Sequence, residues 1–436
     1  MTAPAGLSWP AILRLGLVQT ALGAIIIMTT STLNRVMVVE LALPATLPGL
    51  LVAIHHGVQM LRPRLGYGSD MGARRTPWII GGMALLALGG VVAASAVALM
   101  TTALVPGVVL AALGFFLVGL GVGAAGTSLL ALLASMVEPQ RRAPAATILW
   151  VMMIAGFAVT ATLAGKLLDP YSPGRLVAVT AGVSLFAFLL AVVALRGVEG
   201  APRPAAPTAE AKPAFGLVLR EVWQDRTARR FTVFVFVSML AYSAADLILE
   251  PFAGEVFGRT IGQSTALAGL QNAGTLAGMI VMALFGSGVF GARLASLRLW
   301  MVLGCVGSAL ALVALALAPG REAAPLEPLY FALGLANGAF AAAAIASMMQ
   351  LAGAHRTGTR MGLWGAAQAI AFAIGGFAGT VMADLARAGF GAAAPAYGFV
   401  FLCEAALFLA SAVLAARLGV SRLPSLRITP LKEAVS

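Results

Sequence analysis

Long apolar segments separated by short polar turns constrain this chain more than any other feature. Only 10% of its 436 residues are charged and 60% are hydrophobic, whereas a soluble domain carries about 25% charged residues. A helix needs about 20 apolar residues to cross a bilayer, and only helices or closed barrels satisfy their backbone hydrogen bonds in lipid. Segments of this length and composition predict an all-α polytopic membrane protein.

The apolar segments predict twelve transmembrane helices. These lie near residues 14–37, 48–66, 77–101, 105–136, 144–168, 176–196, 229–252, 262–286, 294–318, 327–352, 360–385 and 395–417. We expect one six-helix bundle in residues 1–196, a cytoplasmic linker at 197–230 and a second bundle in residues 231–436. The linker begins with a Pro- and Ala-rich stretch, which favours an extended chain. Its end alternates apolar and charged residues, which predicts an amphipathic helix on the membrane surface.

An internal repeat supports two pseudo-symmetric bundles. Arg142, Leu149, Trp150 and Gly165 recur in the second half, at a constant offset, as Arg356, Leu363, Trp364 and Gly379. Gly119 and Gly123 recur as Gly334 and Gly338, at an offset larger by one position. Parallel six-helix repeats are typical of major facilitator proteins. The alternative explanation is chance similarity between sequences rich in Gly and Leu.

The basic residues are distributed unevenly between the two predicted faces of the membrane. If alternate turns are assigned to the two faces, 22 of the 28 Lys and Arg residues fall on one face. The other six are Arg35, Lys166, Arg175, Arg259, Arg321 and Arg387. Because cytoplasmic loops collect Lys and Arg, we expect both termini in the cytoplasm. The net charge of +12 then reflects topology in the lipid bilayer, and no nucleic-acid partner is expected.

The turn between the second and third predicted helices carries a recognisable pattern. It places Gly66, Asp70, Arg74 and Arg75 as G-x-x-x-D-x-x-x-R-R, after Arg62 and Arg64. This spacing resembles the signature loop between helices 2 and 3 of the major facilitator superfamily. Met71 and Ala73 depart from that pattern, where a basic residue and a glycine are usual. Its charge also predicts a cytoplasmic loop.

Ionisable residues inside the membrane are costly and therefore informative. The first predicted helix ends with Arg35 and Glu40, and the seventh ends with Asp246, Glu250 and Glu255. Helices 1 and 7 face each other in two pseudo-symmetric bundles, so we expect Arg35 to reach Asp246 or Glu250 directly or through one water. Two interpretations stay open. The group is either a clamp on the non-cytoplasmic ends of the bundles or a site for a proton or substrate.

Five longer segments resemble one branch of the major facilitator superfamily. They are TLNRVMVVELALPATLPGLL, HHGVQMLRPRLGYGSD with RRTPWIIGG, LLDPYSPGRLVAV, DLILEPFAGEVFG and LWGAAQAIAFAIGGFAGT. Together they are similar to the PucC/LhaA family, the bacteriochlorophyll-delivery branch found in phototrophic bacteria. The resemblance implies a factor of the bacterial inner, intracytoplasmic membrane that assembles light-harvesting complexes. Its partners would be antenna polypeptides and bacteriochlorophyll, with bacteriochlorophyll synthase as a further candidate.

The residues argue against catalysis by the chain itself. A prenyl-transferring enzyme needs clustered aspartates to hold magnesium and diphosphate, and no two aspartates here have that spacing. Cys305 and Cys403 both lie inside apolar segments, which implies neither a disulfide framework nor a metal site. Two other functions remain as alternatives to pigment handling. They are proton-coupled transport of a small amphiphile and pigment-free chaperoning of antenna helices.

The resemblance draws attention to His55 and His56 in the second predicted helix. A neutral imidazole can ligate the magnesium of bacteriochlorophyll, or it can simply hydrogen-bond to a neighbouring helix. Adjacent residues lie about 100° apart around a helix, so only one of the two would face a pigment. The glycine-rich stretches 114–126 and 374–380 predict close helix packing, with a smooth wall for a planar ligand as the alternative. Trp150 and Trp364 are expected at the membrane interface.

Overall fold

Helices account for most of the chain that the structure describes. The computed structural model describes residues 7–62, 65, 69, 74–138, 141–200, 224–286, 294, 296–320, 325–352 and 357–418. The first half contains α1 (Trp9–Ile27), η1 (Met28–Thr32), α2 (Leu33–Arg35), η2 (Val36–Glu40), α3 (Thr46–Val58), η3 (Gln59–Leu61), α5 (Thr76–Met100), α6 (Leu104–Met136), α7 (Arg142–Leu168) and α8 (Pro173–Leu195). The second half contains α10 (Arg226–Phe257), α11 (Ile261–Gly286), α12 (Leu297–Ala316), α13 (Leu326–Ala352), α14 (Thr357–Phe390) and α15 (Ala393–Ala416).

The prediction of twelve membrane helices is confirmed. Segments α1 to η2 form one continuous helix over Trp9–Glu40, and eleven helices in the described residues are long and apolar enough to cross a membrane. The twelfth is α3, which is 13 residues long and continues into η3. The first helix, Trp9–Glu40, extends beyond the predicted range 14–37 at both ends. Its last residue, Glu40, forms an ion pair with the buried Arg35.

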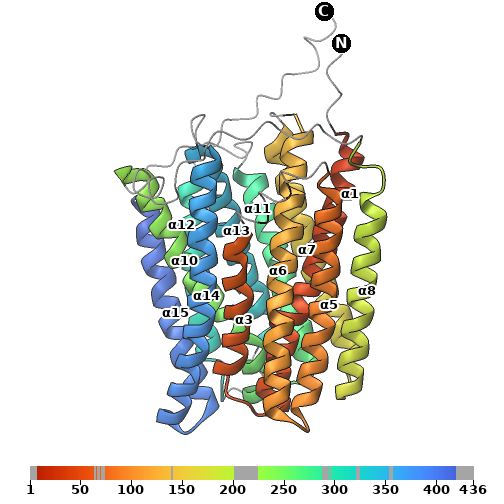
Figure 1. Cartoon of the computed structure of the whole chain (residues 1–436). Helices are drawn as coiled ribbons and strands as arrows, with labels where there is room; N and C mark the ends of the chain where they lie inside the picture. The colour runs from red at the N-terminus through yellow and green to blue at the C-terminus, as the bar shows by residue number, and fades with distance from the viewer. Residues whose placement is uncertain are drawn as a thin grey trace, which may run out of the picture.

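The helices pack as two six-helix bundles, one from α1 to α8 and one from α10 to α15 (Figure 1). One apolar core gathers buried side chains from the second bundle alone, and another lies almost entirely in the first. The bundles meet where α7 packs on α11, where α3 packs on α14, and where the end of the first helix, from η1 to η2, packs on α10. We call this whole contact between the bundles the seam. The start of α1 and the end of α15 lie at the same end of the molecule, the terminal end (Figure 1). The turns after η2, α7, α10 and α14 lie at the opposite end.

The linker assignment at 197–230 stays a prediction, because residues 201–223 lie outside the described part of the chain. Helix α10 begins at Arg226, inside that range. Asp225 caps it by accepting hydrogen bonds from the main-chain N–H groups of Thr227 (2.8 Å) and Ala228 (3.2 Å), as expected of an N-cap residue.

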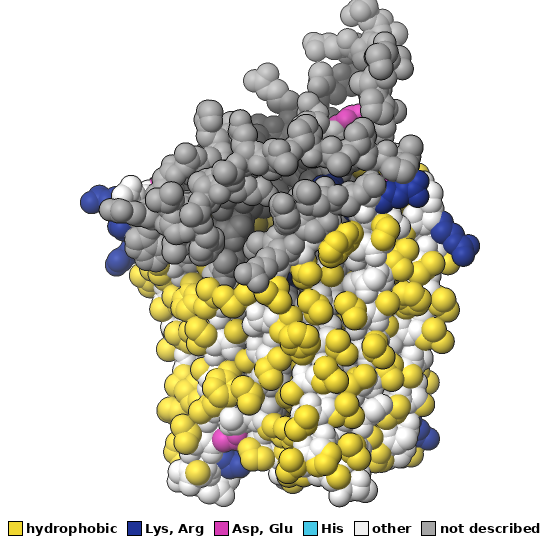
Figure 2. Space-filling model, viewed as in Figure 1, with side chains coloured by type: hydrophobic (Ala, Val, Ile, Leu, Met, Phe, Trp, Pro, Cys, Tyr) yellow, Lys and Arg dark blue, Asp and Glu magenta, His cyan; other side chains and the backbone are white. Residues whose placement is uncertain are grey.

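The outer flank of the molecule is apolar, and its basic side chains gather mainly toward the terminal end (Figure 2). Large apolar residues on the flank are exposed, among them Phe186 (68%) and Val105 (72%). Such exposure would be unfavourable in water, so this surface is suited to lipid.

The glycines of α6 and α14 serve close packing between helices. A Cβ on Gly114 or Gly121 would come within 2.7 or 2.5 Å of main-chain nitrogen atoms of α5, and a Cβ on Gly375 within 2.5 Å of the Leu240 carbonyl of α10. These glycines are therefore covered by neighbouring backbone and do not form a smooth open wall.

Trp364 was expected at the membrane interface, but it lies in the core of the second bundle. It is 1% exposed, and its ring meets that of Phe231 with 5.0 Å between centroids. The second bundle has space for a large aromatic ring at this level, so the indole forms part of the core.

Candidate functional site

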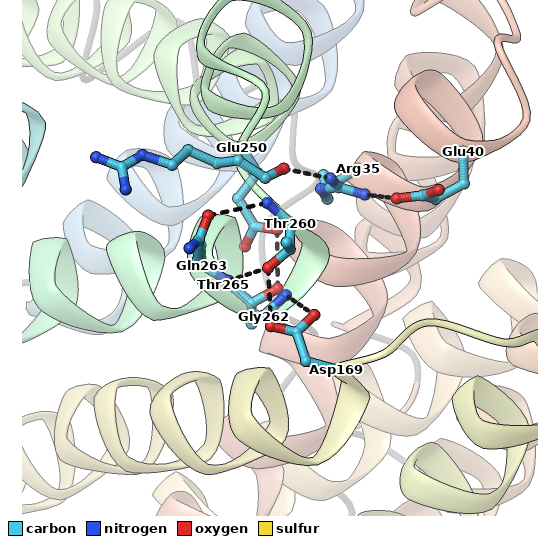
Figure 3. A network of polar contacts seen from close by, with 9 residues as sticks. Arg35, Glu40, Asp169, Glu250, Thr260, Gly262, Gln263 and Thr265 are labelled. Atoms are coloured by element: carbon cyan, nitrogen blue, oxygen red, sulfur yellow. Dashed lines mark hydrogen bonds and ion pairs between the residues drawn. The ribbon is translucent and has the colours of Figure 1, made fainter.

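The seam at the opposite end is built around the last turns of the first helix. There the helix widens into two π-helical segments, η1 and η2, that flank Arg35. Such widenings are frequent at functional sites. The Arg35 residue is 1% exposed and forms an ion pair with Glu40 of its own helix. It also donates a hydrogen bond of 2.8 Å to the main-chain carbonyl of Arg259 in the second bundle (Figure 3).

Among the described residues, Arg35 makes no direct contact with a carboxylate of α10, and the expected alternative, a contact through one water, stays a prediction. Glu250 accepts hydrogen bonds from Ser31 Oγ and from Thr265 Oγ1 (3.3 Å), although it is close enough to interact with the charge of Arg35. The reason lies in the widened turn. A π-helix brings residues five apart onto one face, so Glu40 reaches the guanidinium first.

We expect Glu40→Gln alone to destabilise the protein more than Glu40→Gln combined with Arg35→Gln. The single change leaves a buried cation without its partner, whereas the double change removes both charges. We expect a coupling of about 1–3 kcal/mol in the free energy of unfolding, measured by denaturant titration in detergent. The matched control is Arg259–Glu327, an exposed pair at 3.3 Å, for which we expect about 0–1 kcal/mol. Additive losses for Arg35 and Glu40 would contradict the pairing.

Asp169, the residue after α7, binds the start of α11 across the seam. Its carboxylate accepts hydrogen bonds from the main-chain N–H of Gly262 (3.0 Å) and from Thr260 Oγ1 (2.8 Å) (Figure 3). A carboxylate is stabilised there because the first N–H groups of a helix lack partners and the helix dipole is positive at that end. The glycine permits this approach, since a Cβ on it would overlap the carboxylate.

Asp384 of α14 makes the corresponding contact with the start of α3. It accepts hydrogen bonds from the main-chain N–H groups of Ala45 (3.0 Å) and Thr46 (2.7 Å) and from Thr46 Oγ1 (2.5 Å). The number of positions from Asp169 to Asp384 is the same as that from the first residue of α3 to the first residue of α11. The repeated glycines of α6 and α13 are separated by this same number. The pseudo-symmetry of the bundles therefore relates the two contacts, which we call the paired aspartate clasps.

Tyr171 lies beside the Arg35–Glu40 pair, in the turn between α7 and α8. Burial and the charge of Glu40 raise the pKa of Tyr171, while Arg35 lowers it. Its buried hydroxyl has no hydrogen-bond partner among the described residues. We infer that the neutral phenol fills this end of the seam without carrying charge.

The two histidines of α3 have different surroundings. His55 is 1% exposed, its Nε2 lies 2.9 Å from Gln59 Nε2, and its carbonyl oxygen lies against Gly119 of α6. His56 is partly exposed, and its ring contacts Phe372 of α14 with 5.2 Å between centroids. Only His56 therefore faces the second bundle.

Aromatic and polar groups surround His56 at the seam. The Phe372 ring also contacts Tyr242 of α10, at 5.8 Å between centroids. Asp246 lies one turn further along α10, is partly exposed and interacts with Tyr242. We call His56, Tyr242, Asp246 and Phe372 the His56 cluster. It combines flat apolar surfaces with one imidazole that can ligate a metal. No group of three metal-binding side chains is found among the described residues.

Part of the signature loop lies outside the described residues, including Gly66, Asp70 and Arg64. Arg62, at the end of η3, donates a hydrogen bond to Gln59, the residue that also contacts both histidines. Arg74 is exposed.

Arg75 and Glu199 hold the start of α5 in place. The Arg75 guanidinium donates to Ala131 O (2.8 Å) and Ser135 Oγ (2.7 Å) of α6. The Glu199 carboxylate accepts from the main-chain N–H groups of Arg75 (2.8 Å) and Thr76 (2.7 Å). The Glu199 contacts join the first residues of the predicted linker to the first bundle.

Sequence reasoning did not identify the paired aspartate clasps or the aromatic partners of His56. Asp169 lies in the segment LLDPYSPGRLVAV, and the offset of the repeated glycines leads from it to Asp384. The repeat that begins at Arg142 has an offset smaller by one position and leads to Ala383, so it did not indicate the second aspartate. No sequence pattern indicated that Phe372 and Tyr242 would lie beside His56.

Comparison with known proteins identifies close relatives of the whole chain. The profile of the family described as PUCC protein matches residues 32–423. The "Bacteriochlorophyll synthase 44.5 kDa chain" of Rhodobacter capsulatus is 51% identical over 427 residues, which cover 96% of this chain and 98% of the relative. "Protein PucC" of the same organism is 32% identical, covering 91% of this chain and 90% of the relative.

Solved structures with the same fold are transporters of distant sequence. A bacterial homologue of the lysosomal transporter Spinster superposes with a TM-score of 0.70 at 14% identity, covering 93% of this chain and 96% of that one. A D-xylose–proton symporter superposes with a TM-score of 0.69 at 15% identity, covering 95% and 98%. The architecture is the major facilitator fold.

Proposed function

Because this chain belongs to the PUCC family, we propose that it is an assembly factor of photosynthetic light-harvesting complexes that binds bacteriochlorophyll and delivers it to antenna polypeptides. The observation that carries the proposal is the full-length similarity to a protein named for bacteriochlorophyll synthesis and to proteins named PucC. The major facilitator fold is compatible with it, since the seam between two bundles can open and close around a ligand.

The His56 cluster has the chemistry that a chlorin ligand requires. Bacteriochlorophyll is a flat apolar ring with a magnesium ion that accepts one axial ligand. His56 is partly exposed toward the second bundle, whereas His55 lies in the packing of α3 on α6. His56 would therefore supply the ligand nitrogen, and Phe372 and Tyr242 would pack against the ring.

We propose that the chain carries pigment and does not catalyse its synthesis. The name of the 51% identical relative mentions a synthase, but prenyl transfer needs clustered aspartates, and no two aspartates of this sequence lie within one helical turn of each other. A catalytic partner, bacteriochlorophyll synthase, would then supply the pigment to this chain.

We propose that the terminal end faces the cytoplasm of a phototrophic bacterium, in the intracytoplasmic membrane. The charge asymmetry of the sequence supports this orientation, as does the concentration of basic side chains toward that end (Figure 2). A cysteine placed at the exposed Ala392, in the turn after α14, should react with a membrane-impermeant reagent from the non-cytoplasmic side only.

Proton-coupled transport is the second candidate function. Asp246 and Glu250 are carboxylates within the membrane, beside the seam, and such residues often belong to proton pathways. If the chain were a transporter of this kind, Glu250→Gln would abolish transport and leave antenna assembly intact.

Deletion of the gene tests the proposed function. We expect a deletion strain to lose the near-infrared bands of an assembled antenna while extractable, esterified bacteriochlorophyll is still made. Accumulation of the unesterified precursor would instead indicate a subunit of the synthase. Normal antenna bands would contradict a role in assembly.

A further inference from the structure

A groove on the lipid-facing flank crosses the seam. It has a volume of about 630 Å³ and lies between α7 and α11, with the start of α13 at one end. Its walls are apolar, with Val159 and Leu163 of α7 on one side and Ala266, Leu270 and Ala273 of α11 on the other. Val159 and Leu163 are 57% and 55% exposed, so the groove is open toward lipid.

The groove has the length of one membrane leaflet. On α11 its lining extends from Gln263 to Ala273, which corresponds to about 15 Å of helix. The hydrocarbon core of a bilayer is about 30 Å thick. The lining begins near the first turn of α11, at the opposite end of the molecule, so the groove covers the leaflet at that end.

The end of the groove near the membrane surface carries one charge of each sign. Arg259 and Glu327 both line it, and their side chains lie 3.3 Å apart with 32% and 54% exposure. Arg35 binds only the main-chain carbonyl of Arg259, which leaves the Arg259 guanidinium on the groove side. A phosphate next to an ammonium group would complement this pair.

We propose that the groove binds a phospholipid of the ethanolamine type. One acyl chain would lie between α7 and α11, the phosphate would contact Arg259 and the ammonium group would contact Glu327. The two walls belong to different bundles, so a bound lipid would stabilise the seam next to the Asp169 clasp. This inference does not depend on the protein's handling of pigment.

Native mass spectrometry of the delipidated full-length protein tests the proposal. The protein is titrated with phosphatidylethanolamine and, separately, with phosphatidylglycerol, which lacks the ammonium group. We expect one ethanolamine lipid to be retained at least about tenfold more tightly, a difference of about 1.4 kcal/mol. Ala266→Trp, which fills the groove, should abolish this retention, and Glu327→Gln should remove the preference between the two lipids.

Leu185→Trp serves as the matched control, since Leu185 is a 59% exposed flank residue on α8, outside the groove. It should leave retention of the ethanolamine lipid unchanged. Equal binding of the two lipids by the unaltered protein would overturn the proposal, as would full retention in Ala266→Trp. If Ala266→Trp loses co-purified pigment and keeps the lipid, the groove holds a pigment tail and the proposal fails.

Discussion

His56→Leu should reduce the bacteriochlorophyll that co-purifies with this protein by at least about tenfold, which corresponds to a loss of about 1.4 kcal/mol or more in binding. The substitution keeps an apolar side chain beside Phe372 but removes the His56 imidazole, which is the partly exposed one of the two histidines that the structure describes. The measurement is the ratio of pigment absorbance to protein after mild detergent extraction, with the elution profile showing that the variant is folded.

His55→Asn is the matched control for this prediction. His55 is adjacent in sequence, but it is buried and in contact with Gln59. We expect His55→Asn to change the free energy of unfolding and to leave the pigment-to-protein ratio of the folded fraction unchanged. A full complement of pigment in a His55→Leu/His56→Leu variant would show that neither histidine is the ligand. Loss of pigment in His55→Asn alone would show that the ligand had been assigned to the wrong histidine.

The double variant Asp169→Asn/Asp384→Asn should open the seam at the opposite end. Each aspartate accepts hydrogen bonds from the start of a helix in the other bundle, and a charge-assisted hydrogen bond contributes about 1.5–3 kcal/mol. Asn keeps the shape but removes the charge that the helix dipole stabilises. Because both clasps close the same end, we expect the double variant to show a much larger effect than either single variant.

Opening can be measured through a buried cysteine. Thr380 is fully buried and lies against Gly49 across the seam, so Thr380→Cys reports exposure in a background without Cys305 and Cys403. We expect the double variant to raise its rate of maleimide labelling about a hundredfold, as a shift of about 2.8 kcal/mol would.

Glu255→Gln is the control for the clasps. Glu255 is a carboxylate at the same end, but it pairs with Arg387 of its own bundle at 2.5 Å. Glu255→Gln should leave the rate of maleimide labelling of Thr380→Cys unchanged. Equal labelling of the double variant and the unaltered protein would show that the clasps do not hold the seam.

The fold could be predicted from the sequence because the membrane simplifies the problem. In lipid every backbone group must be satisfied within a helix, so apolar length alone located twelve helices. Exact ends were less predictable. The first helix runs from Trp9 to Glu40, beyond both predicted ends, and α10 begins within the predicted linker.

The candidate site was predictable only in part, because it depends on which side chains meet across the seam. The sequence indicated Arg35, Glu40 and the two histidines as unusual residues within the membrane. It did not indicate that a π-helical turn would pair Arg35 with Glu40 in place of Glu250. Nor did it indicate which histidine faces the second bundle, because that depends on the rotation of α3 against α6 and α14.

The proposed function requires this protein to bind bacteriochlorophyll during antenna assembly. The most direct test is the absorption spectrum of the full-length protein, purified gently from phototrophic membranes of a strain that makes pigment but no antenna polypeptides. We expect bacteriochlorophyll bands at close to one pigment per protein, and we expect His56→Leu to lose them. A pigment-free protein that still rescues antenna assembly in the deletion strain would contradict it and leave a chaperone of antenna helices as the function.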